Sequence, residues 1–250
     1  MSRLAVLLLA VAAMRGCVAY EYEHEFWVRV DGSGSVNVTG RPELWTAFKG
    51  LPLPADEDGQ KTAVRKLFED SGLSVDTVTL THRRGRPYLF VAADFDDVNR
   101  LSSLPAFRDL KIGLRPDGEN LRLEGTWAAP PPAGSVPGDG LMAVRFHLPS
   151  QVYEHKNAFE GVERGNIVSW RQDMQAALRG GALDFGALMD RRSILLSTVL
   201  LFVGAIVLAL GILGGLLYWT MKKGARARAA SGAPGPGSPP PPAPSAPPAP

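Results

Sequence analysis

The chain has 250 residues, of which 27 are Lys or Arg and 25 are Asp or Glu, so its formal net charge is only +2. A charge balance this close to neutral gives no broad basic surface, and we therefore expect no nucleic-acid partner. The chain has one cysteine, which excludes an internal disulfide, so the fold must be stabilised by an apolar core.

The N-terminus has the pattern of a secretory signal. Arg3 precedes the apolar stretch LAVLLLAVAA, which is too short to cross a bilayer. We predict a signal peptide over residues 1–19. The single cysteine, Cys17, lies where this segment ends, and a lone cysteine at that place resembles the lipid-attachment site of a bacterial lipoprotein. Ordinary cleavage after Ala19 is the alternative, and the sequence leaves both open.

The first predicted elements are a hairpin and two helices. FWVRV and VNVTG alternate apolar and polar residues around the turn DGSGS, which predicts a β-hairpin with Phe26, Val28 and Val30 on one face. Two helices should follow, because Pro42 suits a first helical turn and Gly72 suits a helix end. They are expected at residues 41–49 and 60–72.

Further hairpins fill the middle of the chain. Residues 75–82 and 87–95 form one predicted strand pair, and residues 110–116 and 120–127 form another around a DG turn. Between these pairs, Asp96 should cap a short helix that runs to Leu104. The order of elements predicts an α+β fold, with an antiparallel β-sheet built from hairpins and short helices on one of its faces.

The rest of the N-terminal region is predicted to be a loop, two strands and a linker. Residues 128–140 are rich in Pro and Gly, which indicates a surface loop or a boundary between subdomains. Strands are expected at residues 141–150 and 166–173. We place an ectodomain at residues 20–172 and a juxtamembrane linker at residues 173–192, which begins as a short helix and continues as a tether loosened by glycines.

An apolar segment without one charged residue runs from Ile194 to Trp219. A bilayer core needs about 20 such residues, so we predict a transmembrane helix at residues 193–220. Lys222, Lys223 and two arginines follow it, and cationic residues favour the cytoplasmic side. We therefore expect a single-pass protein of the plasma membrane, with its ectodomain outside and a basic, then Pro-rich and disordered tail (221–250) in the cytoplasm.

One segment carries a family resemblance. A strand that ends in Leu-Pro, then an Asn, and then Gly-Asn-x-Val-x-Trp resembles the closing segment of the LppM domain family, which are bacterial cell-envelope ectodomains. The matching residues are Leu148, Pro149, Asn157, Gly165, Asn166, Val168 and Trp170. The resemblance implies an α+β envelope domain with lipid or glycolipid binding as its candidate activity, and it brings no catalytic residues. From the residues themselves, Asn166 should serve a turn and Trp170 should fill the core.

The sequence holds no recognised catalytic, metal or cofactor motif. Its four histidines are isolated, and the acidic group of Asp94, Asp96 and Asp97 should cap a helix, with cation binding by the carboxylates as the alternative. The basic run from His82 to Arg86 is an exposed hairpin tip or a patch for anionic lipid. We expect a non-enzymatic protein that contacts membrane lipid and binds a lipid or glycolipid. The alternative is an assembly protein that contacts another envelope protein.

Overall fold

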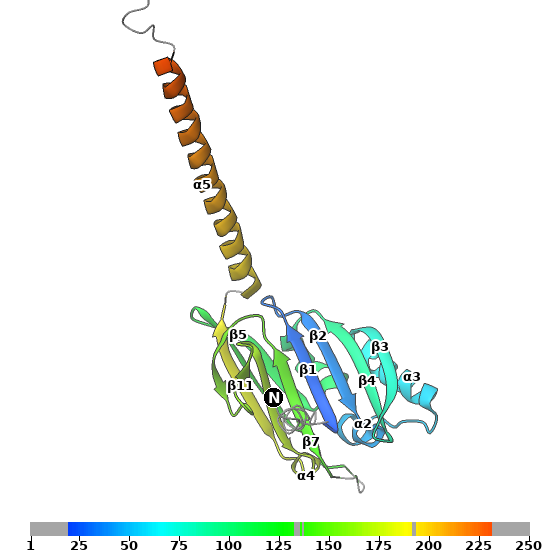
Figure 1. Ribbon diagram of the computed structural model, residues 1–250. Helices are drawn as coiled ribbons and strands as arrows, with labels where there is room; N and C mark the ends of the chain where they lie inside the picture. Colours follow the sequence, from blue (N-terminus) through cyan, green and yellow to red (C-terminus); the bar gives the residue numbers. More distant parts are fainter. Residues whose placement is uncertain (1–19, 133–135, 137, 192–193, 232–250) are drawn as a thin grey trace, which may run out of the picture. The chain divides into compact units, whose positions relative to one another are not determined.

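A computed structural model describes residues 20–132, 136, 138–191 and 194–231 (Figure 1). The chain divides into two compact units, one that ends at Ile194 and one that begins at Leu195. The elements of the first unit are β1 Tyr22–Val28, β2 Gly34–Gly40, α2 Pro42–Lys49, α3 Glu57–Asp70, β3 Ser74–Arg83, β4 Arg86–Phe95, the 3-10 helices η1 Val98–Ser103 and η2 Pro105–Phe107, β5 Leu110–Asp117, β6 Asn120–Trp127, β7 Leu141–His147, β8 Val152–Lys156, β9 Val162–Glu163, β10 Ile167–Asp173, α4 Met174–Leu178 and β11 Leu183–Asp190.

The strands form two sheets. Sheet A has the order β3-β4-β2-β1-β7-β10-β9, and sheet B has the order β5-β6-β11-β8. All neighbouring strands are antiparallel except β1 and β7, which run parallel in the middle of sheet A. The predicted α+β class with hairpins and short helices is confirmed. The division into two sheets and the parallel pair are additions that the sequence did not indicate.

The predicted hairpins form where turn residues permit them. Arg84 and Gly85 connect β3 to β4 with φ values of 51° and 76°, and Gly118 connects β5 to β6 with φ of 60°. Positive φ at such positions matches the twist of antiparallel strands. In the first hairpin Phe26 and Val28 are buried as expected, but Val30 lies beyond the end of β1 and is exposed.

The helices begin and end at identifiable residues. Pro42 opens α2, and Gly50 follows it in the left-handed region with φ of 64°. At α3, the Asp56 side chain accepts a hydrogen bond of 2.6 Å from the backbone N–H of Gly59. Both helices were predicted. The expected cap at Asp96 is wrong by one residue, because Asp97 accepts the hydrogen bond from Asn99 at the start of η1.

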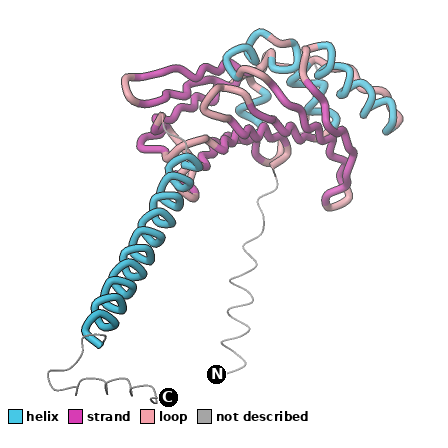
Figure 2. Tube along the Cα trace, turned by 90° about the horizontal axis from the view of Figure 1, so that it is seen from above, coloured by secondary structure: helices cyan, strands magenta, loops and turns pink. Residues whose placement is uncertain are grey.

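One apolar core joins both sheets and the helices. Figure 2 shows helical segments of the first unit along one side of its strands. Sheet A turns Tyr22, Phe26 and Val91 inward; α2 and α3 cover part of this face, and sheet B packs on the rest of it. Aromatic rings fill the contact between the sheets, where the ring centroid of Phe185 on β11 lies 5.5 Å from the centroids of both Phe146 and Trp170. Aromatic side chains therefore pack closely where the two sheets meet.

The predicted juxtamembrane linker needs correction. Its short helix exists as α4, but residues 183–190 are no tether, because they form β11, which is hydrogen-bonded to β6 on one side and β8 on the other. Phe185, Ala187 and Met189 of this strand are buried. Because β11 has a partner strand on each side, it is a central strand of sheet B. Its buried side chains belong to the core, so the folded domain extends past residue 172 to Asp190.

The second unit contains one long helix, α5, which spans Ile194–Ser231. Residues Thr198–Lys223 have a mean hydropathy of 2.7, and none of this segment is buried in the protein. A core helix of a soluble protein would be mostly buried. α5 is thus long and apolar enough to cross a membrane. It also continues through the basic cluster that we assigned to the tail, whereas Cys17, the predicted signal peptide and the end of the tail lie outside the described residues.

Candidate functional site

The outer face of sheet B, which points away from the core, carries the candidate site. Strand register places its side chains in rows across the four strands. One row reads Gly113, Glu124, Gly186 and Lys156 on β5, β6, β11 and β8. Two glycines thus alternate with two charged residues, and no side chain stands on either side of Glu124.

These glycines lie within two hollows on the same face. The larger has a volume of about 560 Å³ and includes Gly113, and the smaller has a volume of about 180 Å³ and includes Gly186. Glu124 and Lys156 line both hollows. A β-carbon added to Gly113 would touch only the Asn99 side chain at 3.8 Å, so the floor there is open. The two hollows together form a polar groove, in which charged side chains flank the backbone exposed at Gly113 and Gly186.

The neighbouring rows surround the groove with charges of both signs. Arg115 pairs with Glu124 at 2.6 Å, and Lys156 pairs with Asp184 at 3.3 Å. All four side chains are at least half exposed, and exposed ion pairs contribute at most about 1 kcal/mol each, so a ligand can exchange with them at little cost. Lys111 lies in the same groove and has no ion-pair partner among the described residues.

A 3-10 helix fixes one rim of the groove. The Ser102 hydroxyl of η1 accepts a hydrogen bond of 2.8 Å from the N–H of Ile112, and Asn99 accepts one of 2.7 Å from the N–H of Leu114. These bonds occupy donors on the edge of β5 that another strand would otherwise use. The edge of sheet B is thereby held in place beside the groove.

The residues of the family-like segment lie in and around strand β10. Three of these residues lie in the connections around the strands: Pro149 is half-buried before β8, Asn157 follows β8 with φ of 56°, and Gly165 precedes β10 with φ of 80°. The Asn166 side chain donates a hydrogen bond of 2.8 Å to the Leu148 carbonyl. Val168 and Trp170 of β10 are fully buried. The motif residues do not gather into a ligand site. One of them does touch it, because the indole N–H of Trp170 donates to the backbone carbonyl of Lys156.

A second polar group is buried between the sheets. Lys49 Nζ lies 2.7 Å from Asp109 Oδ1 and 3.2 Å from His24 Nε2, and the Trp127 indole donates to Asp109 at 3.0 Å. Burial, and then the neighbouring Lys49 charge, hold the pKa of His24 well below its usual range. Because all these side chains are closed to solvent, no substrate reaches them. The group connects β1, α2 and β6 and is structural.

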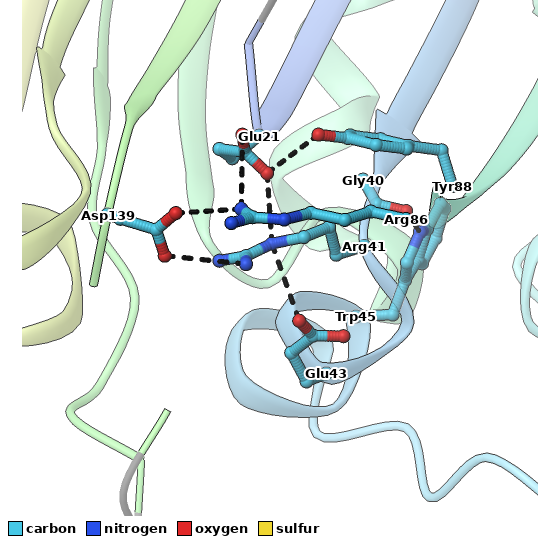
Figure 3. Close-up of polar contacts among 8 residues, drawn as sticks. All are labelled: Glu21, Gly40, Arg41, Glu43, Trp45, Arg86, Tyr88 and Asp139. Carbon is cyan, nitrogen blue, oxygen red and sulfur yellow. Dashed lines mark hydrogen bonds and ion pairs between the residues drawn. The ribbon is translucent and has the colours of Figure 1, made fainter. Parts of the chain in front are cut away.

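A third polar cluster gathers around Asp139, which lies just before β7 (Figure 3). Asp139 lies 2.7 Å from Arg86 and 3.5 Å from Arg41, and Arg41 also pairs with Glu21 at 3.0 Å. The Tyr88 hydroxyl donates to Glu21 at 2.7 Å, and burial together with this carboxylate raises the pKa of Tyr88 to about 12. Because Arg41 and Arg86 are both paired with carboxylates, the cluster has a structural role and holds Asp139 in place.

Other candidate groups also have structural partners. In the basic hairpin tip, Arg83 stacks on Tyr88 at 5.0 Å and Arg86 binds Asp139. Arg84, at the turn itself, is exposed like its two neighbours and has no ion pair with a described residue. Asp97 caps η1, as stated above. Across the part of the chain that the structure describes, no group of three or more His, Cys, Asp and Glu side chains could hold a metal ion.

The sequence analysis did not single out the residues of the groove. The charged residues of the groove lie on four different strands, and the sequence does not reveal which strands are neighbours. These residues are Lys111, Glu124, Lys156 and Asp184. The one available signal was the charged residues at several outward positions of β5 and β6, namely Lys111, Arg115, Arg122 and Glu124. That pattern is also typical of any solvated strand face.

Comparisons with known proteins add one structural likeness. No protein-family model matches the chain, and no curated protein matches its sequence. The folded domain of the LppM protein of Mycobacterium tuberculosis, solved by NMR, is similar over 70% of this chain and 92% of its own length, with 16% sequence identity and a TM-score of 0.39. A likeness at this level concerns the course of the chain only and carries no conclusion about function.

Proposed function

We propose that the chain is a membrane-anchored, extracytoplasmic binding module that holds the polar headgroup of a lipid or glycolipid on the outer face of sheet B. The observation that carries this proposal is the polar groove over Gly113 and Gly186, with Glu124 and Lys156 shared by its two hollows. The module has no catalytic role in this proposal. Its ligand enters and leaves without chemical change.

The chemistry of the groove suits a sugar or phosphate headgroup. Hydroxyl groups both donate and accept hydrogen bonds, so they match a surface where carboxylates and ammonium groups alternate. Lys111, whose charge is not neutralised by a partner among the described residues, suits a phosphate or carboxylate on the ligand. Acyl chains would remain in the bilayer, because the apolar interior of the domain is already filled by aromatic side chains.

The proposed orientation follows from α5 and its flanks. Lys222 and Lys223 follow the apolar segment, and cationic residues favour the cytoplasmic side of a membrane. The domain before α5 then faces outward, where envelope lipids with large headgroups are exposed. In this proposal α5 supplies the anchor and sheet B supplies the recognition.

Native mass spectrometry of the full chain, purified from the membranes of its host, tests the proposal. We expect a lipid or glycolipid to copurify, and we expect Gly186→Leu to abolish its retention, because a leucine there would stand between Glu124 and Lys156 inside the groove. Thr79→Leu on the exposed face of β3 is the matched control. Equal retention by Gly186→Leu and the parent would refute the assignment of the ligand to sheet B.

The same experiment addresses the assembly role. Apart from α5, the described residues expose three large apolar side chains, Val30, Tyr153 and Phe159, and these come from separate segments of the chain. This gives no specific support for a protein interface. A protein partner retained in place of any lipid would nevertheless favour assembly over ligand binding.

A further inference from the structure

A third hollow lies where the folded domain meets the chain that leads into α5. It has a volume of about 500 Å³ and is lined by Gly118, Glu119, Asn120, Tyr153, Asp190 and Arg191. The turn between β5 and β6 forms one wall, and the end of β11 forms another. None of these residues belongs to the groove described above.

In the sequence, the hollow's residues Asp190 and Arg191 lie just before α5, the helix that is able to cross a membrane. Asp190 ends β11 and Ile194 begins α5, with only residues 191–193 between them. Four Cα-to-Cα steps of 3.8 Å limit the distance between these two residues to about 15 Å. With α5 across a membrane, this short connection would place Asp190 and Arg191 near the lipid headgroups.

The charges in the hollow are of both signs. Glu119 and Arg191 are exposed and have no ion-pair partner among the described residues, whereas Asp190 accepts a hydrogen bond of 3.2 Å from the Tyr153 hydroxyl. The described residues of its lining include two carboxylates and one guanidinium group, which sum to a net charge of −1. A purely anionic headgroup would therefore be repelled, and one that carries an ammonium group as well as a phosphate would be favoured.

We propose that this hollow binds the phosphoethanolamine headgroup of a membrane phospholipid. Arg191 pairs with the phosphate, because guanidinium groups match the geometry of phosphate oxygens. Glu119 and Asp190 accept hydrogen bonds from the primary ammonium group. A choline headgroup has no N–H to donate and binds less well. The lipid holds the membrane-proximal end of sheet B at the bilayer surface, and this role needs the span but not a particular orientation.

The test uses the full chain in nanodiscs that contain equal amounts of phosphatidylethanolamine, phosphatidylcholine and phosphatidylglycerol. After mild release, native mass spectrometry counts the lipids that stay bound. We expect phosphatidylethanolamine to be enriched. Arg191→Gln should lower retention of this lipid about tenfold, as expected for the loss of one charged hydrogen bond. Glu119→Gln should instead reduce the preference over phosphatidylglycerol, because the net charge of the hollow rises to zero.

Two controls make the outcome decisive. Lys66→Gln removes an exposed charge on α3, far along the chain from the hollow, and should change nothing. Arg191→Gln and Glu119→Gln change only residues of the hollow and Gly186→Leu changes only a residue of the groove, so failure of one proposal is distinguished from failure of the other. Retained lipids in the same proportions as the nanodisc, with no response to either hollow variant, would overturn the inference.

Discussion

Lys49 of α2 and Asp109 before β5 form an ion pair of 2.7 Å in which neither side chain has any exposed surface. The pair joins the helical layer over sheet A to the start of sheet B, because the Trp127 indole of β6 also donates to Asp109. Burial lowers the pKa of Lys49, and the adjacent Asp109 opposes this shift. The attraction of Asp109 thus favours the charged ammonium group against the effect of burial.

Removing one member of this pair should be severe. Lys49→Met leaves the Asp109 carboxylate buried without its cation, which costs about 3–5 kcal/mol of unfolding free energy. Adding Asp109→Asn to Lys49→Met removes the unpaired charge and keeps an acceptor for Trp127, so most of this loss should be recovered. Denaturant unfolding of the full chain in nanodiscs, followed by tryptophan fluorescence, measures both values. A double variant no more stable than the single one would contradict this account.

His24 should make stability depend on pH. Its pKa is lowered in the folded protein, so below about pH 6.5 the unfolded chain binds a proton at this residue that the folded protein excludes. The contribution of His24 is thus complete above that pH and is lost as the pH falls, by up to about 1.4 kcal/mol per pH unit. Unfolding at pH 7.5 and 5.5 should show a smaller drop for His24→Phe than for the parent. Identical drops would show that His24 is not the titrating group.

Two glycines of sheet B should respond differently to the same substitution. A β-carbon at Gly125 would collide with the Phe185 ring and with the Lys111 carbonyl, so Gly125→Ala should cost about 1–3 kcal/mol. Gly113 has open space at this position, and Gly113→Ala should change stability by less than about 0.5 kcal/mol. Thermal unfolding of both variants compares them directly. Equal losses would mean that the packing of Phe185 against β6 is not as described.

The proposed orientation can be tested by cysteine labelling of intact cells. In a Cys17→Ala background, a cysteine at the exposed Lys66 of α3 should react with a membrane-impermeant maleimide. A cysteine at Ser238, beyond α5, should react only after the membrane is opened. Labelling of Ser238→Cys but not Lys66→Cys in intact cells would reverse the orientation.

Most local elements could be predicted from the sequence, because their signals lie within a few residues. The turn glycines of the hairpins and Pro42 of α2 are such signals. β11 was missed although Leu183, Phe185, Ala187 and Met189 alternate as in a strand, because the preceding glycines and the nearby span favoured a tether. The parallel pairing of Phe26 with Phe146 joins segments far apart in sequence, and local patterns carry no information about it.

The candidate site could not be predicted for the same reason. The groove exists only because Gly113, Glu124, Gly186 and Lys156 fall in one row, and that row depends on three separate strand registers. A shift of one residue in β11 would move Gly186 to the inner face and fill the groove. The sequence supplied the charged and glycine residues but not their alignment.

The position of β11 has a consequence for the order in which the protein folds. The chain is synthesised from its N-terminus, so β6 and β8 emerge before the strand that must lie between them. Until residues 183–190 arrive, the edges of β6 and β8 that hydrogen-bond to β11 have no partner strand. Because α5 begins directly afterwards, the strand that completes sheet B is synthesised immediately before the apolar helix. Sheet B therefore cannot be complete until synthesis has reached the start of α5.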